Sequence, residues 1–261
     1  MIGTIIGHLI GAEYSRSEMK STLRIRKRDP IVDTICLIAI CKTFTETGIT
    51  DLIELSEAIK SNIQKYTGLY SESKDQMMNS ILPSNFNNNN VGIQVPPVAW
   101  VATTVEEALL ISDCVTATTA NCPEAIKEAR AITFAIFLAR HGTEKDKIRQ
   151  SIQQRFYPSI SCFTSRNSIM RQKLAGEEVA LAIIAFLESD SFEGAISNAL
   201  RMEEDTASTL AAITGAIAEA YYGVPNELKE MALLSMDHNF ATVIRQFEQK
   251  YQSYCDESYG N

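Results

Sequence analysis

The residues that could support metal, acid–base or nucleophilic chemistry are few and widely spaced along the chain. The three histidines, His8, His141 and His238, do not have the spacing of ligands to a shared metal ion. The sequence contains no Gly-x-Ser-x-Gly nucleophile elbow, no phosphate-binding Gly–Lys loop and no His-Glu-x-x-His pair. A cation in the last turn of a helix interacts favourably with the helix dipole, so we expect a structural role for His141. His238 falls near a predicted helix start, where an exposed position is expected.

The cysteines also argue against a metal or disulfide framework. None of the six belongs to a Cys-x-x-Cys pair. Five positions separate Cys36 from Cys41, which places the two thiols on different faces of a helix. Several cysteines fall in apolar helical segments, where a free thiol acts as a small hydrophobic group. This usage fits a reducing compartment, so we expect a cytoplasmic protein.

The overall composition excludes several classes of partner. The 261 residues carry a formal net charge of −8 and are 45% hydrophobic. Nucleic acids and anionic membranes bind cationic surfaces, so neither is an expected partner. The short basic stretch Arg24–Arg28 is interpreted as a solvated loop or a phosphate-facing edge. The longest uncharged apolar runs fall short of the ~20 residues that cross a bilayer, and no cleaved signal peptide is expected.

Apolar residues repeat at helical spacing along almost the whole chain, which predicts one all-α domain over residues 1–261. From residue 67 to residue 97 the periodicity disappears, and the Asn-rich run Ser84–Asn90 predicts a loop. No alternating strand pattern or interdomain linker is visible. Helices are expected at the N-terminal apolar segment and over 31–44, 50–66, 104–114, 123–142, 176–189, 191–202, 206–222, 226–234 and 238–251.

The segment Thr206–Pro225 (TASTLAAITGAIAEAYYGVP) is the most informative of these helices. Small residues at Ala211, Gly215 and Ala218 predict close packing against a neighbouring helix. The stretch from Thr209 to Gly223 resembles the last signature of the ADP-ribosylglycohydrolase family. Further stretches are similar to other signatures of that family, in the same order and over nearly the whole chain. The resemblance implies an orthogonal helix bundle of the ADP-ribosylglycohydrolase type.

The resemblance also implies that a metal site has been lost. Family members usually enter the last signature through Asp-Thr/Ser-Asp-Thr, which binds catalytic magnesium, and the matching positions here read Thr206, Ala207, Ser208 and Thr209. The segment Ile31-Val32-Asp33-Thr34 resembles the family's Thr-Asp-Asp-Thr signature, in which Asp33 is the one carboxylate that remains. Magnesium is normally anchored by carboxylates. We therefore expect no bound cofactor, with vestigial metal positions at Asp33, Thr206, Ser208 and Thr209.

Three acidic residues precede these positions, but they do not restore the pattern in its own register. Glu203, Glu204 and Asp205 could supply ligands if the register shifted, but the shift would break the alignment of the following helix. Asp33 is therefore the only aligned acidic candidate for a catalytic role.

The signatures that contact ADP-ribose in the family are altered as well. Met1–Ser15 is similar to the opening helix Gly-x-x-x-Gly-Asp-x-x-Gly, with His8 in place of the Asp. Val95–Val98 resembles the end of the ADP-ribose-contacting loop, and residues 120–124 (ANCPE) parallel His-Asn-His-Pro-Glu. The candidate ligand-binding residues implied by the resemblance are His8, Asn88, Asn89, Asn90, Gly92, Asn121 and Cys122.

Three functions are consistent with the sequence. The first is preferred, because the helix-packing stretches match the family while the ligand-contacting signatures do not. The first is a catalytically impaired relative that binds ADP-ribose, an ADP-ribosylated protein or a protein partner. The second is an active ADP-ribosyl(-protein) hydrolase with a rebuilt or single-metal site around Asp33, which would need magnesium. A purely structural or toxin-neutralising protein that binds no nucleotide is a third reading.

Overall fold

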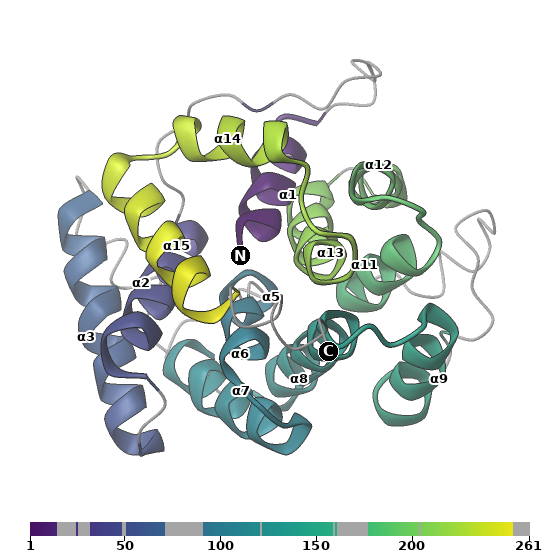
Figure 1. Ribbon diagram of the computed structural model, residues 1–261. Coiled ribbons are helices and arrows are strands. Elements are labelled where there is room, and N and C mark those ends of the chain that lie inside the picture. Colours follow the sequence, from purple (N-terminus) through teal and green to yellow (C-terminus); the bar gives the residue numbers. More distant parts are fainter. Residues whose placement is uncertain are drawn as a thin grey trace, which may run out of the picture. The chain divides into compact units, whose positions relative to one another are not determined.

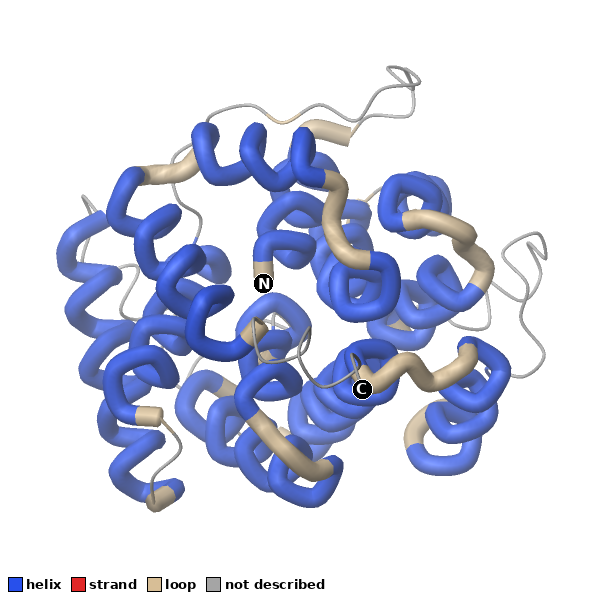
Figure 2. The backbone as a smooth tube through the Cα atoms, viewed as in Figure 1, coloured by secondary structure: helices blue, strands red, loops and turns tan. Residues whose placement is uncertain are grey.

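The computed structural model describes residues 1–14, 25, 32–48, 51–70, 91–120, 122–158, 160, 177–203 and 205–252. The regular elements in these ranges are helices, and no strand occurs among them (Figure 2), which confirms the all-α class. No helix in the described part of the chain is both long and apolar enough to cross a membrane.

The chain forms two compact units, and each is built from two separate stretches of sequence. The first unit contains residues 1–27 and 134–235, and the second contains residues 28–133 and 236–261. The residues of helix α8 (Pro123–Arg140) are divided between them. The expectation of a single domain over 1–261 stays a prediction.

The first unit is organised around α13 (Ala207–Tyr222; Figure 1). Its residues from Leu210 to Ala218 are all buried. This helix packs against α1 (Ile2–Ala12), α11 (Glu178–Leu187) and α12 (Phe192–Met202). The unit also contains α9 (Lys145–Arg155) and α14 (Asn226–Ser235). The Lys145 ammonium group binds the backbone oxygen of Phe186 at 2.9 Å, which ties α9 to the carboxyl end of α11.

Glycines allow α1 and α13 to approach each other at backbone distance. A Cβ atom on Gly7 would lie 1.9 Å from the Ala211 oxygen, and one on Gly3 would lie 2.4 Å from the Gly215 oxygen. Gly11 continues the same face one turn later. Side chains at these positions would collide with the α13 backbone, so glycine is required for the close approach. The close packing predicted from Ala211 and Gly215 is confirmed.

The second unit is organised around α2 (Val32–Thr47). This helix packs against α3 (Leu52–Tyr70), α5 (Val91–Gln94), α6 (Pro96–Val101) and α15 (His238–Tyr251). Residues Ile35 to Cys41 of α2 are at most 1% exposed, as expected of a helix covered on several sides. The Lys250 ammonium group and the Tyr251 hydroxyl donate to the last carbonyl groups of α2. The unit also contains α7 (Val105–Thr119).

The predicted loop over residues 67–97 is wrong at both ends. Helix α3 continues to Tyr70, and α5 and α6 occupy residues 91–94 and 96–101. Proline is tolerated in the first turn of a helix, which explains why Pro96 and Pro97 begin α6 rather than prevent it. The Asn-rich run Ser84–Asn90 lies outside the described residues. Helix α7 also extends beyond the predicted end at residue 114, and α9 was not expected.

Candidate functional site

The structure brings together His8 and Ser208, two of the candidate residues identified from the sequence, within the first unit. Ser208 Oγ lies 3.1 Å from His8 Nδ1 and donates to the backbone oxygen of His8 at 3.2 Å. Both contacts are satisfied when Nδ1 carries a proton and donates to Oγ. His8 is 6% exposed, and Ser208 is half-buried. The close approach of α1 and α13 therefore places a hydrogen-bonded pair at the start of α13.

Hydroxyl groups, and no carboxylates, line the first turn of α13. Thr206 is the N-cap residue, but its side chain does not cap the helix. Its Oγ1 donates to Glu203 Oε2 at 3.2 Å instead. Thr209 is half-buried on the same turn, and the turn contains no acidic residue. The first turn itself therefore offers oxygen atoms without formal charge, and the Glu203 carboxylate contacts it from the preceding segment.

The carboxyl group of Glu178 was missed by sequence reasoning. Burial raises the pKa of Glu178 above its usual 4.5, and the charge of Glu203 raises it further. Glu203, which follows α12 and contacts Thr206, was considered only through a register shift. The signal for Glu178 is the Glu177–Glu178 doublet before the apolar run of α11. In the described ranges, no group of three or more His, Cys, Asp or Glu residues could hold a metal ion.

Asp33 lies in the first turn of α2, where the helix dipole favours a carboxylate. It is half-buried, and the next residue, Thr34, is 9% exposed. Burial and the charge of Asp33 together raise the pKa of the Cys36 thiol to about 12, so this cysteine is an unreactive core residue. Asp33 belongs to the second unit, whereas Thr206, Ser208 and Thr209 belong to the first. A site that combines these four residues stays a prediction.

Most of the other candidate ligand-binding residues belong to parts of the chain that the structure does not describe. Asn88, Asn89, Asn90 and Asn121 lie outside the described residues. Gly92 is buried in α5, the helix whose Gln94 side chain accepts a hydrogen bond from Thr119 at 2.6 Å. Cys122 is half-buried just before Pro123 begins α8. Roles for Gly92 and Cys122 in ligand binding stay predictions.

The two remaining histidines behave as the sequence predicts. His141 Nδ1 lies 2.7 Å from the Phe137 backbone oxygen, and its ring stacks on the Phe137 ring at 4.1 Å. These contacts give His141 a structural role at the end of α8. His238 is exposed at the start of α15.

The comparisons with known proteins match nearly the whole chain. A family model described as ADP-ribosylglycohydrolase matches residues 1–253. A solved structure described as an ADP-ribosylglycohydrolase-related protein complex is similar with a TM-score of 0.67 and 14% sequence identity. The match covers 95% of this chain and 95% of that chain, and at this identity it shows the fold alone. No curated protein matches the sequence.

Proposed function

The chain belongs to the ADP-ribosylglycohydrolase family, and we propose that it acts by binding rather than by efficient hydrolysis. Its ligand would be ADP-ribose, an ADP-ribosylated protein or a protein partner. The observation that supports the proposal is the start of α13, where the first turn contains no acidic residue and Ser208 is hydrogen-bonded to His8. The sequence resemblance assigns the hydroxyl-bearing residues of this turn to the metal-binding positions of the family.

The residues present do not fit a site for two magnesium ions. Magnesium prefers octahedral oxygen coordination anchored by carboxylates, and two ions need several negative charges nearby. The first turn of α13 supplies none. Thr206 donates to Glu203, and Ser208 contacts His8, so two of the remaining hydroxyl groups already have protein partners. These features support the proposal that magnesium binds here too weakly for the hydrolysis that the family catalyses.

An active ADP-ribosyl(-protein) hydrolase is the alternative function. The observation that favours it is the Glu203 carboxylate, which contacts Thr206 just before the first turn of α13 and whose charge raises the pKa of Glu178. Asp33 would then assist a water molecule as a general base, within a rebuilt or single-metal site. This alternative requires magnesium, whereas the binding function does not.

Calorimetry with ADP-ribose, with and without magnesium, separates the two functions. The binding proposal predicts that ADP-ribose binds with the same affinity under both conditions and that Asp33→Asn leaves this affinity within a few-fold. The hydrolase alternative predicts that magnesium strengthens binding and that Asp33→Asn removes the magnesium effect. A magnesium-dependent affinity that Asp33→Asn abolishes would therefore reject the proposal.

A further inference from the structure

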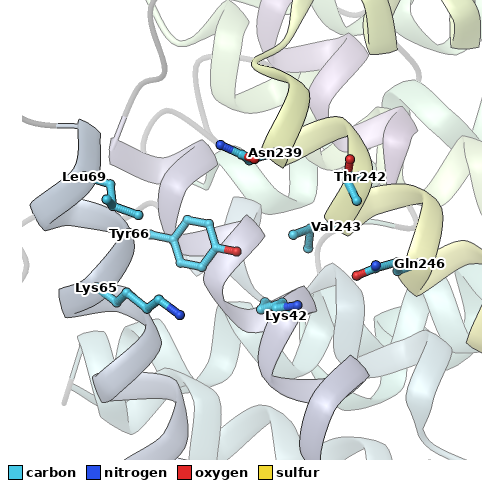
Figure 3. A pocket seen from close by; sticks show the side chains of 8 residues that line it. All are labelled: Lys42, Lys65, Tyr66, Leu69, Asn239, Thr242, Val243 and Gln246. Carbon is cyan, nitrogen blue, oxygen red and sulfur yellow. The ribbon is translucent and has the colours of Figure 1, made fainter.

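A cavity of about 310 Å³ lies in the second unit, between α2, α3 and α15 (Figure 3). Its lining combines ammonium, hydroxyl and amide groups with an apolar wall. Leu69 and Val243 form the apolar wall, and the polar groups belong to Lys42, Lys65, Tyr66, Asn239, Thr242 and Gln246. The volume is near the lower end of the range for small-molecule sites, so the cavity fits a small ligand.

Tyr66 gives this cavity a fixed hydrogen-bonding group. The residue is 8% exposed, and its ring packs against the Phe240 ring at 6.1 Å. Figure 3 shows its hydroxyl pointing into the space between α3 and α15. Burial raises the pKa of Tyr66, with a smaller contribution from Glu46, so the hydroxyl stays protonated and can donate at neutral pH. No residue that the structure describes forms a hydrogen bond with this hydroxyl, which leaves it available to a ligand in the cavity.

The charges around the cavity favour an anion. Lys42 and Lys65 both line it, and the net charge of the chain is −8, so two neighbouring ammonium groups are a local exception. Lys42 forms an ion pair with Glu46, whose carboxylate lies 3.1 Å from the Lys42 ammonium group. Glu46 is 50% exposed, so water screens its pairing with Lys42.

We propose that this cavity binds a small phosphate monoester. The phosphate oxygens would accept hydrogen bonds from Lys42, Lys65, Tyr66 and Gln246, because a doubly charged group with three terminal oxygens matches two ammonium groups and two further donors. The organic part would lie against Leu69 and Val243. None of these residues is among those implied by the family resemblance, so the inference does not rest on the proposed function.

The test is an NMR titration of the protein with inorganic phosphate and with phenyl phosphate at constant ionic strength. Both probes should cause saturable shifts at residues 65–69 and 242–246, and phenyl phosphate should bind more tightly because its ring contacts Leu69. Tyr66→Phe and Lys65→Ala should each weaken both probes about three- to tenfold. Leu69→Asn should weaken phenyl phosphate and leave inorganic phosphate unchanged.

Two further variants distinguish a loss of ligand binding from a loss of protein stability. Glu46→Gln should strengthen both probes about twofold, because it frees Lys42 from its ion pair. Lys60→Ala removes an exposed lysine of α3 that does not line the cavity, and it should change neither affinity. The inference fails if the shifts do not saturate, if Tyr66→Phe has no effect, or if Lys60→Ala weakens binding as much as Lys65→Ala. It also fails if a phosphoserine peptide binds more tightly than phenyl phosphate, which would indicate a protein ligand.

Discussion

At the scale of single residues, the His8–Ser208 contact is the feature of the proposal that mutagenesis tests best. The contact joins residues that are 200 positions apart, and His8 is buried. A hydrogen bond between partly buried groups contributes about 1 kcal/mol to stability. The hydrogen bond therefore joins the two polar side chains, and with them α1 and α13, without a metal ion.

Ser208→Ala should lower the free energy of unfolding by about 1–2 kcal/mol, because it removes the contact with both His8 Nδ1 and the His8 carbonyl group. Thr209→Ala is the control, since it removes a hydroxyl group from the same helical turn and should change stability by less than about 0.5 kcal/mol. Denaturant unfolding followed by circular dichroism measures both values. Equal effects for the two variants would show that the pair is not a structural link.

Glu178→Gln should stabilise the protein near neutral pH. The folded-state pKa of Glu178 lies above its usual 4.5, so the folded state prefers the protonated carboxyl group. Its contribution to stability is therefore present below pH 4.5 and is lost as the pH rises through the folded-state pKa. The wild-type unfolding free energy should fall over this window relative to that of Glu178→Gln.

Denaturation midpoints measured from pH 4.5 to neutral pH would show this difference. Glu57→Gln, at an exposed position of α3, is the matched control and should follow the wild type. A constant difference between wild type and Glu178→Gln at every pH would contradict the burial of a carboxyl group at this position.

The sequence resemblance could single out His8 and Ser208 one by one, but it could not pair them. Their contact depends on the closeness of two helices from opposite ends of the chain. The same limit hid Glu178, whose pKa responds to Glu203 only after α11 and the end of α12 have packed. His141 was easier to interpret, because its partner Phe137 lies one turn earlier in the same helix.

At the scale of the elements, long periodic helices were predictable and short or polar ones were not. The bounds of α15 agree with those expected from its apolar spacing. Helix α9 was missed because only Ile148 and Ile152 are buried among its 11 residues, which leaves a weak pattern. The short helices α5 and α6 were missed because prolines and continuous burial hide any helical period.

The glycine face of α1 gives the sharpest prediction about an element. Gly7→Ala should destabilise the protein by more than about 4 kcal/mol or prevent folding, because the new Cβ would lie 1.9 Å from the Ala211 oxygen. Gly68→Ala, in α3, has no atom within 4 Å of its new Cβ and should instead stabilise by about 0.5–1 kcal/mol. Thermal unfolding compares the two, and a mild effect of Gly7→Ala would rule out backbone contact between α1 and α13.

At the scale of the whole molecule, the family match also covers the positions where the resemblance implies lost metal ligands. The family model spans residues 1–253, while the first turn of α13 contains no acidic residue. A fold can persist when its site changes, because packing and ligand binding depend on different residues. This division explains why the fold was predictable from the sequence while the activity needs measurement.

Restoring carboxylates tests whether the scaffold still supports a metal site. Val32→Asp alone should change magnesium affinity little, because the start of α13 would still lack charge. Ile31→Thr, Val32→Asp, Thr206→Asp and Ser208→Asp together should produce measurable magnesium binding by calorimetry. Adding His8→Asp should strengthen it further, since His8 would otherwise pair with the new carboxylate at position 208. Equal binding by the unmodified protein would contradict this account.

The most direct test of the central claim is the rate at which the unmodified protein releases ADP-ribose from ADP-ribosylarginine and ADP-ribosylserine substrates in magnesium. A relative that retains all the magnesium ligands serves as the reference, and Asp33→Asn serves as the matched variant. The account predicts turnover far slower than that of the reference, with Asp33→Asn causing no further loss. Robust magnesium-dependent turnover that Asp33→Asn abolishes would contradict it and would identify a working hydrolase with a rebuilt site.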